Sequence, residues 1–98
     1  MPLAKRIAIV GATGAVGQEF CAVLRQRRFP IASVRLFASR RSAGQTVPGV
    51  NGPTTVEQLT HDSLVDIDVA LFSAGASVSR EFAPLAVRAG AVVIDNSS

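Results

Sequence analysis

Three glycines recur at every third position near the start of the chain, as Gly11, Gly14 and Gly17. The short apolar run at residues 6–10 predicts a buried strand before them, and residues 18–28 have the apolar spacing of a helix. A glycine-rich turn between a strand and a helix is the setting in which such a motif binds a dinucleotide. One glycine lets the chain turn sharply, one lets the backbone approach a pyrophosphate, and one lets the helix pack close to the strand. We expect the phosphates at the helix N-terminus, where unpaired N–H groups and the helix dipole favour negative charge.

The spacing of the motif is G-x-x-G-x-x-G, and Thr13 stands where the commoner G-x-G-x-x-G pattern has its second glycine. We interpret the segment as a variant of the dinucleotide-binding motif. A tight strand-to-helix turn without a ligand is the alternative interpretation. A P-loop is excluded, because no Gly-Lys-Ser/Thr sequence follows the glycines.

The end of the second expected strand indicates which dinucleotide would bind. Folds specific for NAD usually carry Asp or Glu about 20 residues after the glycines, to hold the ribose 2′-OH. Here no carboxylate lies between Glu19 and Glu57, and the sequence SRRS occupies residues 39–42. A guanidinium pairs with a 2′-phosphate through charge-assisted hydrogen bonds, and serine hydroxyls also donate to it. The segment therefore favours NADP over NAD, with a solvated basic loop as the alternative.

Strands alternate with helices along the whole chain. The expected strands are residues 6–10, 33–37, 54–56, 68–73 and 91–95. The expected helices are residues 14–28 and 79–89, with Pro84 near the first turn of the second, a helical turn at 63–65 and a loop at 46–53. This alternation predicts an α/β fold with a Rossmann-like doubly wound parallel sheet and strand order 3-2-1-4-5. The loops at 11–17, 38–44, 73–79 and 96–98 all follow strands, so we expect them to converge on one crevice.

Composition limits the classes of protein that remain. Ninety-eight residues make one domain, and 48% hydrophobic with 17% charged residues predicts a packed core. No apolar run approaches the roughly 18 residues that span a bilayer, and no secretory signal is visible. The single Cys21 excludes an intramolecular disulfide, and one Cys with one His makes a metal site improbable. We therefore expect a cytoplasmic protein that does not bind membranes or metal.

The basic residues do not predict nucleic-acid binding, although the net charge is +3. They form two small groups, and the chain has no Tyr or Trp on which bases could stack. The end of the chain at Ser98, directly after an expected buried strand, predicts the N-terminal part of a longer protein. We treat residues 1–98 as one NADP-binding Rossmann-like domain.

Four segments together resemble the aspartate-semialdehyde dehydrogenase family. They are IVGATGAVG at 9–17, FASRRSAG at 37–44, ALFSAG at 70–75 and VIDNSS at 93–98, in the order and spacing of the family. The resemblance implies a homodimeric, two-domain enzyme of lysine, methionine and threonine biosynthesis. Its reaction is the reversible reduction of L-4-aspartyl phosphate by NADPH to L-aspartate 4-semialdehyde and phosphate.

The resemblance also implies which residues hold NADP. The residues on the pyrophosphate side are Thr13, Gly14, Ala15 and Val16, together with Gly11 in the turn. Those around the 2′-phosphate are Ser39, Arg41 and Ser42, and Gly75 lies along the path of the adenosine or the nicotinamide.

No catalytic residue is expected in this chain. The nucleophilic cysteine, the catalytic histidine and the substrate-binding arginines that the resemblance implies lie beyond Ser98. Cys21 lies within an expected helix among apolar residues, so we interpret it as a structural residue, and His61 as a surface residue. Two alternatives stay open. One is N-acetyl-γ-glutamyl-phosphate reductase, against which the loop at 39–44 argues, and the other is a non-catalytic NADP-binding module.

Overall fold

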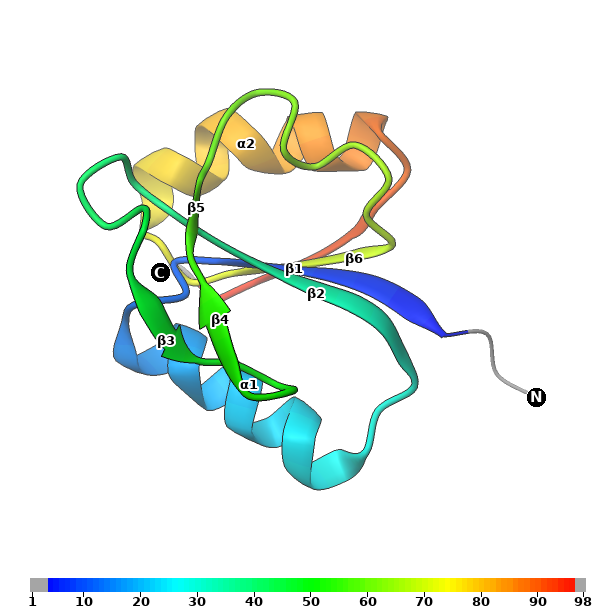
Figure 1. Ribbon diagram of the computed structural model, residues 1–98. Coiled ribbons are helices and arrows are strands. Elements are labelled where there is room, and N and C mark those ends of the chain that lie inside the picture. Colours follow the sequence, from blue (N-terminus) through cyan, green and yellow to red (C-terminus); the bar gives the residue numbers. More distant parts are fainter. Residues whose placement is uncertain (1–3, 97–98) are drawn as a thin grey trace.

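The computed structural model describes residues 4–96. Five parallel strands form one sheet in the order β5-β2-β1-β6-β7. Their bounds are β1 Lys5–Val10, β2 Ile31–Ala38, β5 Glu57–Gln58, β6 Val69–Phe72 and β7 Val92–Asp95. Helices α1 (Ala15–Arg27) and α2 (Ala76–Arg88) cover opposite faces of the sheet (Figure 1). The predicted Rossmann-like α/β fold and its strand order are therefore confirmed.

Strand β1 is the centre of the sheet and is buried on both faces. Ile7 and Ile9 pack in the cluster that contains Cys21 of α1, whereas Ala8 and Val10 pack in the cluster of α2. These four residues, 7–10, are at most 1% exposed. A strand covered by helices on both sides needs a continuous apolar run rather than an alternating one, and residues 7–10 provide it.

The third strand of the sheet differs from the prediction. Residues 53–55 belong to β4 (Pro53–Thr55), which pairs antiparallel with β3 (Thr46–Pro48) in a separate hairpin beside α1 (Figure 1). The Gly49 N–H donates to the Gly52 carbonyl at 2.9 Å and closes the hairpin. The strand that joins the sheet is β5, two residues long, which pairs with β2. A strand does lie at residues 53–55, close to the predicted 54–56, but it is not the third strand of the main sheet. The expected loop at 46–53 was wrong at residues 46–48, which pair with this strand across the glycine turn.

Helix α2 begins three residues earlier than predicted. Gly75, with φ +99°, is its N-cap, and Pro84 lies in the interior of the helix rather than in its first turn. Pro84 is exposed, so water can reach the carbonyl that its missing N–H leaves unpaired. Residues 61–66 form turns, in which the N–H groups of Ser63 and Val65 donate to the carbonyls of Thr60 and Asp62. The Ser63 hydroxyl accepts the Thr60 N–H at 2.8 Å. The expected turn at 63–65 is therefore present.

The register aligns three strand ends at one edge of the sheet. Val10, the last residue of β1, is paired with Phe37 of β2 and with Phe72 of β6. The loops that follow these strands therefore leave the sheet side by side. Any ligand bound there would meet all three loops at once.

Candidate cofactor-binding site

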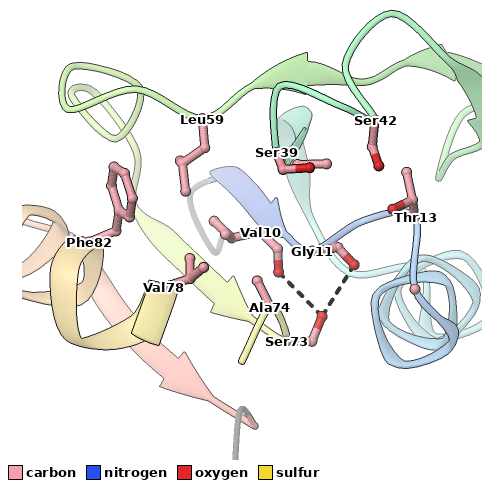
Figure 2. A pocket seen from close by; sticks show the side chains of 12 residues that line it. Val10, Gly11, Thr13, Ser39, Ser42, Leu59, Ser73, Ala74, Val78 and Phe82 are labelled. Carbon is pink, nitrogen blue, oxygen red and sulfur yellow. Dashed lines mark hydrogen bonds between the residues drawn. The ribbon is translucent and has the colours of Figure 1, made fainter. Parts of the chain in front are cut away.

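The loops after β1, β2 and β6 enclose a pocket of about 440 Å³, shown in Figure 2. One end is polar and the other apolar. The polar end has Gly11, Thr13, Gly14, Ser39, Ser42 and Ser73. The apolar part has Val10, Ala38, Leu59, Ala74, Val78 and Phe82. The expected convergence of the loops is confirmed for these three, and residues 97–98 of the fourth lie outside the described residues.

The glycine turn is held tightly against the end of β2. The N–H groups of Gly11 and Ala12 both donate to the Phe37 carbonyl, at 2.9 and 3.1 Å. Gly11 has φ +89°, a conformation that residues with a side chain rarely adopt. A Cβ on Gly17 would lie 2.2 Å from the Gly11 carbonyl oxygen, so only glycine lets α1 approach the turn. These two glycines therefore do the turning and the close packing that the motif predicts.

Gly14 differs from the other two glycines. Its φ of −82° suits any residue, and a Cβ there would meet only the Gly11 oxygen at 3.6 Å, an ordinary contact. The fold itself therefore does not require glycine at this position. Since Gly14 lines the pocket, the absence of a side chain leaves room for a ligand to approach the backbone. This is the fit expected for a pyrophosphate.

Both helices begin beside the pocket, and no side chain caps the backbone N–H groups of their first turns. Their N-caps are Gly14 and Gly75, and neither first turn contains an acidic residue. In α1 the Gln18 N–H donates to the Gly14 carbonyl at 3.0 Å, and within residues 4–96 no backbone acceptor faces the N–H groups of residues 15–17. Unpaired N–H groups and the positive end of the helix dipole favour a bound anion.

The loop after β2 carries the basic residues of the site. Its turn is closed by the N–H groups of Ser42 and Ala43, which both donate to the Ser39 carbonyl at 3.0 Å. Ser39 and Ser42 face the pocket, and Arg40 and Arg41 are exposed at the tip. Among the described residues, no carboxylate lies within ion-pair distance of either guanidinium. Both charges remain available to an anionic ligand.

An acidic residue, Glu57, lies beside Phe37 through the pairing of β5 with β2. Its carboxylate accepts from the Arg35 guanidinium at 2.6 and 3.0 Å, and this pairing lowers the pKa of Glu57. Glu57 is not among the pocket-lining residues. It therefore does not take the position of a carboxylate that would hold a ribose 2′-OH.

Comparison with known proteins agrees with this geometry. Residues 6–98 match the family described as semialdehyde dehydrogenase, NAD binding domain. The chain belongs to this family. Two similar relatives are the aspartate-semialdehyde dehydrogenases of Corynebacterium glutamicum, 54% identical over 95 residues, and Legionella pneumophila, 52% identical over 92 residues. Each match covers 94% of this chain, but only 28% and 26% of those relatives' own length.

Solved structures of the family have the same fold. Aspartate semialdehyde dehydrogenase II from Vibrio cholerae, complexed with ASA, superposes with a TM-score of 0.89 at 42% identity, over 97% of this chain and 31% of that one. The Candida albicans enzyme with NADP superposes with a TM-score of 0.74 at 26% identity, over 97% of this chain and 30% of that one. The chain thus corresponds to the nucleotide-binding part of longer semialdehyde dehydrogenases.

The predicted site residues divide into two sets in this family member. Those that line the pocket are Gly11, Thr13, Gly14, Ser39 and Ser42. Those that lie in the bordering turns and helix ends are Ala15, Val16, Arg41 and Gly75. Ala15 and Val16 face a neighbouring apolar depression beside β7.

The sequence interpretation missed the apolar end of the pocket. Leu59 follows β5, and Val78 and Phe82 stand four residues apart on α2, so both lie on the same helix face (Figure 2). The i, i+4 spacing could have indicated Val78 and Phe82. Leu59 could not be placed, because the strand before it was misassigned.

Cys21 and His61, which the sequence analysis interprets as non-catalytic, do not line the pocket. Cys21 is fully buried in the core beneath α1, and burial raises the pKa of its thiol. A buried thiol with a raised pKa is a poor nucleophile, and this position supports the interpretation of Cys21 as a structural residue. His61 is an exposed surface residue whose Nε2 lies 2.9 Å from the Glu81 carboxylate. Over residues 4–96, no helix is long and apolar enough to cross a bilayer.

Proposed function

We propose that this chain binds NADP(H) and is the cofactor-binding part of an aspartate-semialdehyde dehydrogenase. The observation that carries the proposal is the make-up of the pocket. A glycine turn and an uncapped helix end lie at one side, and the loop with Ser39 and Ser42 lies at the other. Among residues 4–96, no carboxylate lines the space between them. The family match supports nicotinamide dinucleotide binding, and the solved Candida albicans relative was determined with NADP.

In this proposal each part of the dinucleotide has its own partners. The residues of the pyrophosphate side are Gly11, Thr13, Gly14, Ala15 and Val16. The unpaired N–H groups of Ala15 and Val16 would donate to the phosphates, and the lack of a side chain on Gly14 leaves room for them. The residues of the 2′-phosphate side are Ser39, Arg41 and Ser42, through hydroxyl and guanidinium donors. Gly75, at the start of α2, follows the path of the adenosine or the nicotinamide.

The apolar end of the pocket then receives the adenine. Leu59, Val78 and Phe82 offer apolar surface beyond the two serines, where a flat ring would lose contact with water. The nicotinamide extends to the opposite side of the turn.

The intact protein would be a homodimeric, cytoplasmic enzyme that reduces L-4-aspartyl phosphate to L-aspartate 4-semialdehyde and phosphate. NADPH supplies the hydride for this reaction. The chain spans less than a third of the relatives it matches, and residues 1–98 act as the cofactor-binding domain. Formation of an acyl-enzyme needs a thiolate and a proton-transfer group, and neither Cys21 nor His61 lines the pocket.

The cofactor preference can be tested by fluorescence titration of the 98-residue chain with NADPH and with NADH. We expect tighter binding of NADPH, and an Arg41→Ala variant that loses about tenfold in NADPH affinity while NADH affinity stays the same. Arg88→Ala is the matched control, since Arg88 lies at the far end of α2 and outside this pocket. Equal or tighter binding of NADH would refute the NADP assignment.

The absence of a nucleophile can be tested with phosphate-dependent reduction of NADP by aspartate semialdehyde. We expect no turnover from the 98-residue chain or from its Cys21→Ser variant. Turnover that disappears in the Cys21→Ser variant would show that the buried thiol is catalytic.

A further inference from the structure

Ser73 connects two loops of the pocket at the point where they leave the sheet. It is the first residue after β6, and its backbone N–H donates to the Val10 carbonyl at 2.9 Å. Its hydroxyl lies 3.2 Å from the Val10 carbonyl oxygen and 3.4 Å from the Gly11 carbonyl oxygen (Figure 2). The single hydroxyl proton is therefore shared between the last residue of β1 and the first residue of the glycine turn.

The peptide group between Gly11 and Ala12 is held from both sides. Its N–H, on Ala12, donates to the Phe37 carbonyl of β2 at 3.1 Å. Its carbonyl, on Gly11, accepts from the Ser73 hydroxyl and from the Gly14 N–H at 3.2 Å. Residues from both sides of β1 thus fix one peptide plane: Phe37 of β2 through its backbone carbonyl, and Ser73, directly after β6, through its side chain.

The orientation of this peptide decides where the following residues point. Glycine at position 11 has backbone conformations that other residues lack, so the peptide plane could rotate if one side were released. Such rotation would move residues 12–14 and the start of α1, and with them the N–H groups that face the pocket. A binding site that must be ordered by its ligand binds that ligand more weakly.

We propose that Ser73 is a positioning residue for the pyrophosphate of the cofactor. Its hydroxyl holds the Gly11 carbonyl away from the phosphates and keeps the N–H groups at the start of α1 directed toward them. This inference rests on the proposed function. It adds a residue outside the glycine motif, contributed by the loop after β6 and more than 60 positions away in the chain.

The test compares ligands with and without a pyrophosphate, by calorimetry on the full 98-residue chain. NADP⁺ contains the pyrophosphate, whereas adenosine 2′-monophosphate contains only the adenine, the ribose and the 2′-phosphate. We expect Ser73→Ala to weaken NADP⁺ binding about three- to fivefold, since both hydroxyl contacts are long. Binding of adenosine 2′-monophosphate should change less than twofold. Ser33→Ala, on the exposed part of β2, is the matched control and should change neither affinity.

A second measurement needs no cofactor. In Ser73→Ala, the backbone bond from Ser73 to Val10 remains, so β1 and β6 stay paired and the chain should fold. Amide hydrogen exchange by NMR should be faster at Ala12 and Gly14, and unchanged at Ile9 in the core. Unchanged exchange at Ala12 and Gly14 would overturn the inference.

The outcomes separate the two proposals. Absence of NADP⁺ binding by the unsubstituted chain would refute the proposed function. Normal NADP⁺ binding by the unsubstituted chain, with equal affinity in Ser73→Ala, would refute the role of Ser73 alone. Equal losses for NADP⁺ and adenosine 2′-monophosphate would also refute it, because a general loss of structure would then explain both.

Discussion

Replacing Gly17 by alanine places a methyl group where α1 meets the glycine turn. The added Cβ would lie 2.2 Å from the Gly11 carbonyl oxygen, 2.8 Å from the Ala12 Cα and 2.9 Å from the Gly11 carbonyl carbon. All three are backbone atoms, so no side chain can rotate away. The helix must move by about 0.8 Å to bring the shortest contact to 3.0 Å, the lower limit of real Cβ contacts.

The size of the effect follows from two opposing contributions. Forcing an extra carbon into a packed site costs about 1–3 kcal/mol, and contact with immobile backbone puts Gly17→Ala at the upper end. Alanine in a helix is favoured over glycine by about 1 kcal/mol. The free energy of unfolding should therefore fall by about 2 kcal/mol, which lowers the melting temperature by roughly 10 °C in a domain of this size.

Urea unfolding followed by circular dichroism measures this loss, with Gly14→Ala as the matched control. The Cβ at Gly14 meets one atom at 3.6 Å, so this variant should lose less than about 1 kcal/mol, mainly from a less favourable N-cap. A Gly17→Ala variant as stable as Gly14→Ala would refute the close approach of α1 to the turn.

Two further predictions follow from the site and from the far end of β1. Gly14→Val should leave the circular dichroism spectrum folded but abolish NADPH binding, because the side chain would occupy the place of the pyrophosphate; unchanged affinity in a fluorescence titration would mean that the phosphates lie elsewhere. Arg6 donates to the Asp68 carboxylate from its side chain at 3.1 Å and from its backbone N–H at 2.7 Å, which lowers the pKa of Asp68 to about 2. The stabilisation is therefore complete above the ordinary carboxyl pKa of about 3.9 and is lost as the pH falls toward 2. Asp68→Asn should be less stable at pH 7 and lose less stability than the unsubstituted chain between about pH 4 and pH 2, as urea midpoints measured at each pH would show; parallel pH profiles would contradict this assignment.

The sequence by itself determined the strand, turn and helix around Gly11, Gly14 and Gly17. These elements depend on local properties: an apolar run, a helical spacing and the freedom of glycine. The strand order 3-2-1-4-5 followed as well, since parallel strands joined by right-handed crossovers leave few topologies. Most of the polar half of the pocket was therefore visible in the sequence, because its residues lie in the loops that follow strands.

Only the tertiary structure decided the third strand, the apolar half of the pocket and the contacts of Ser73. Residues 46–48 pair with residues 53–55 because a turn between Gly49 and Gly52 brings them together. Each of these two strands is three residues long, and its sequence alone is only a weak indication of a strand. Leu59 and Phe82 come from elements on either side of the 61–66 turns, and their meeting depends on how α2 packs on the sheet. Ser73 reaches Gly11 only through the register of β6 against β1. The contacts of Leu59, Phe82 and Ser73 join residues far apart in the chain, and local patterns do not determine distances of that kind.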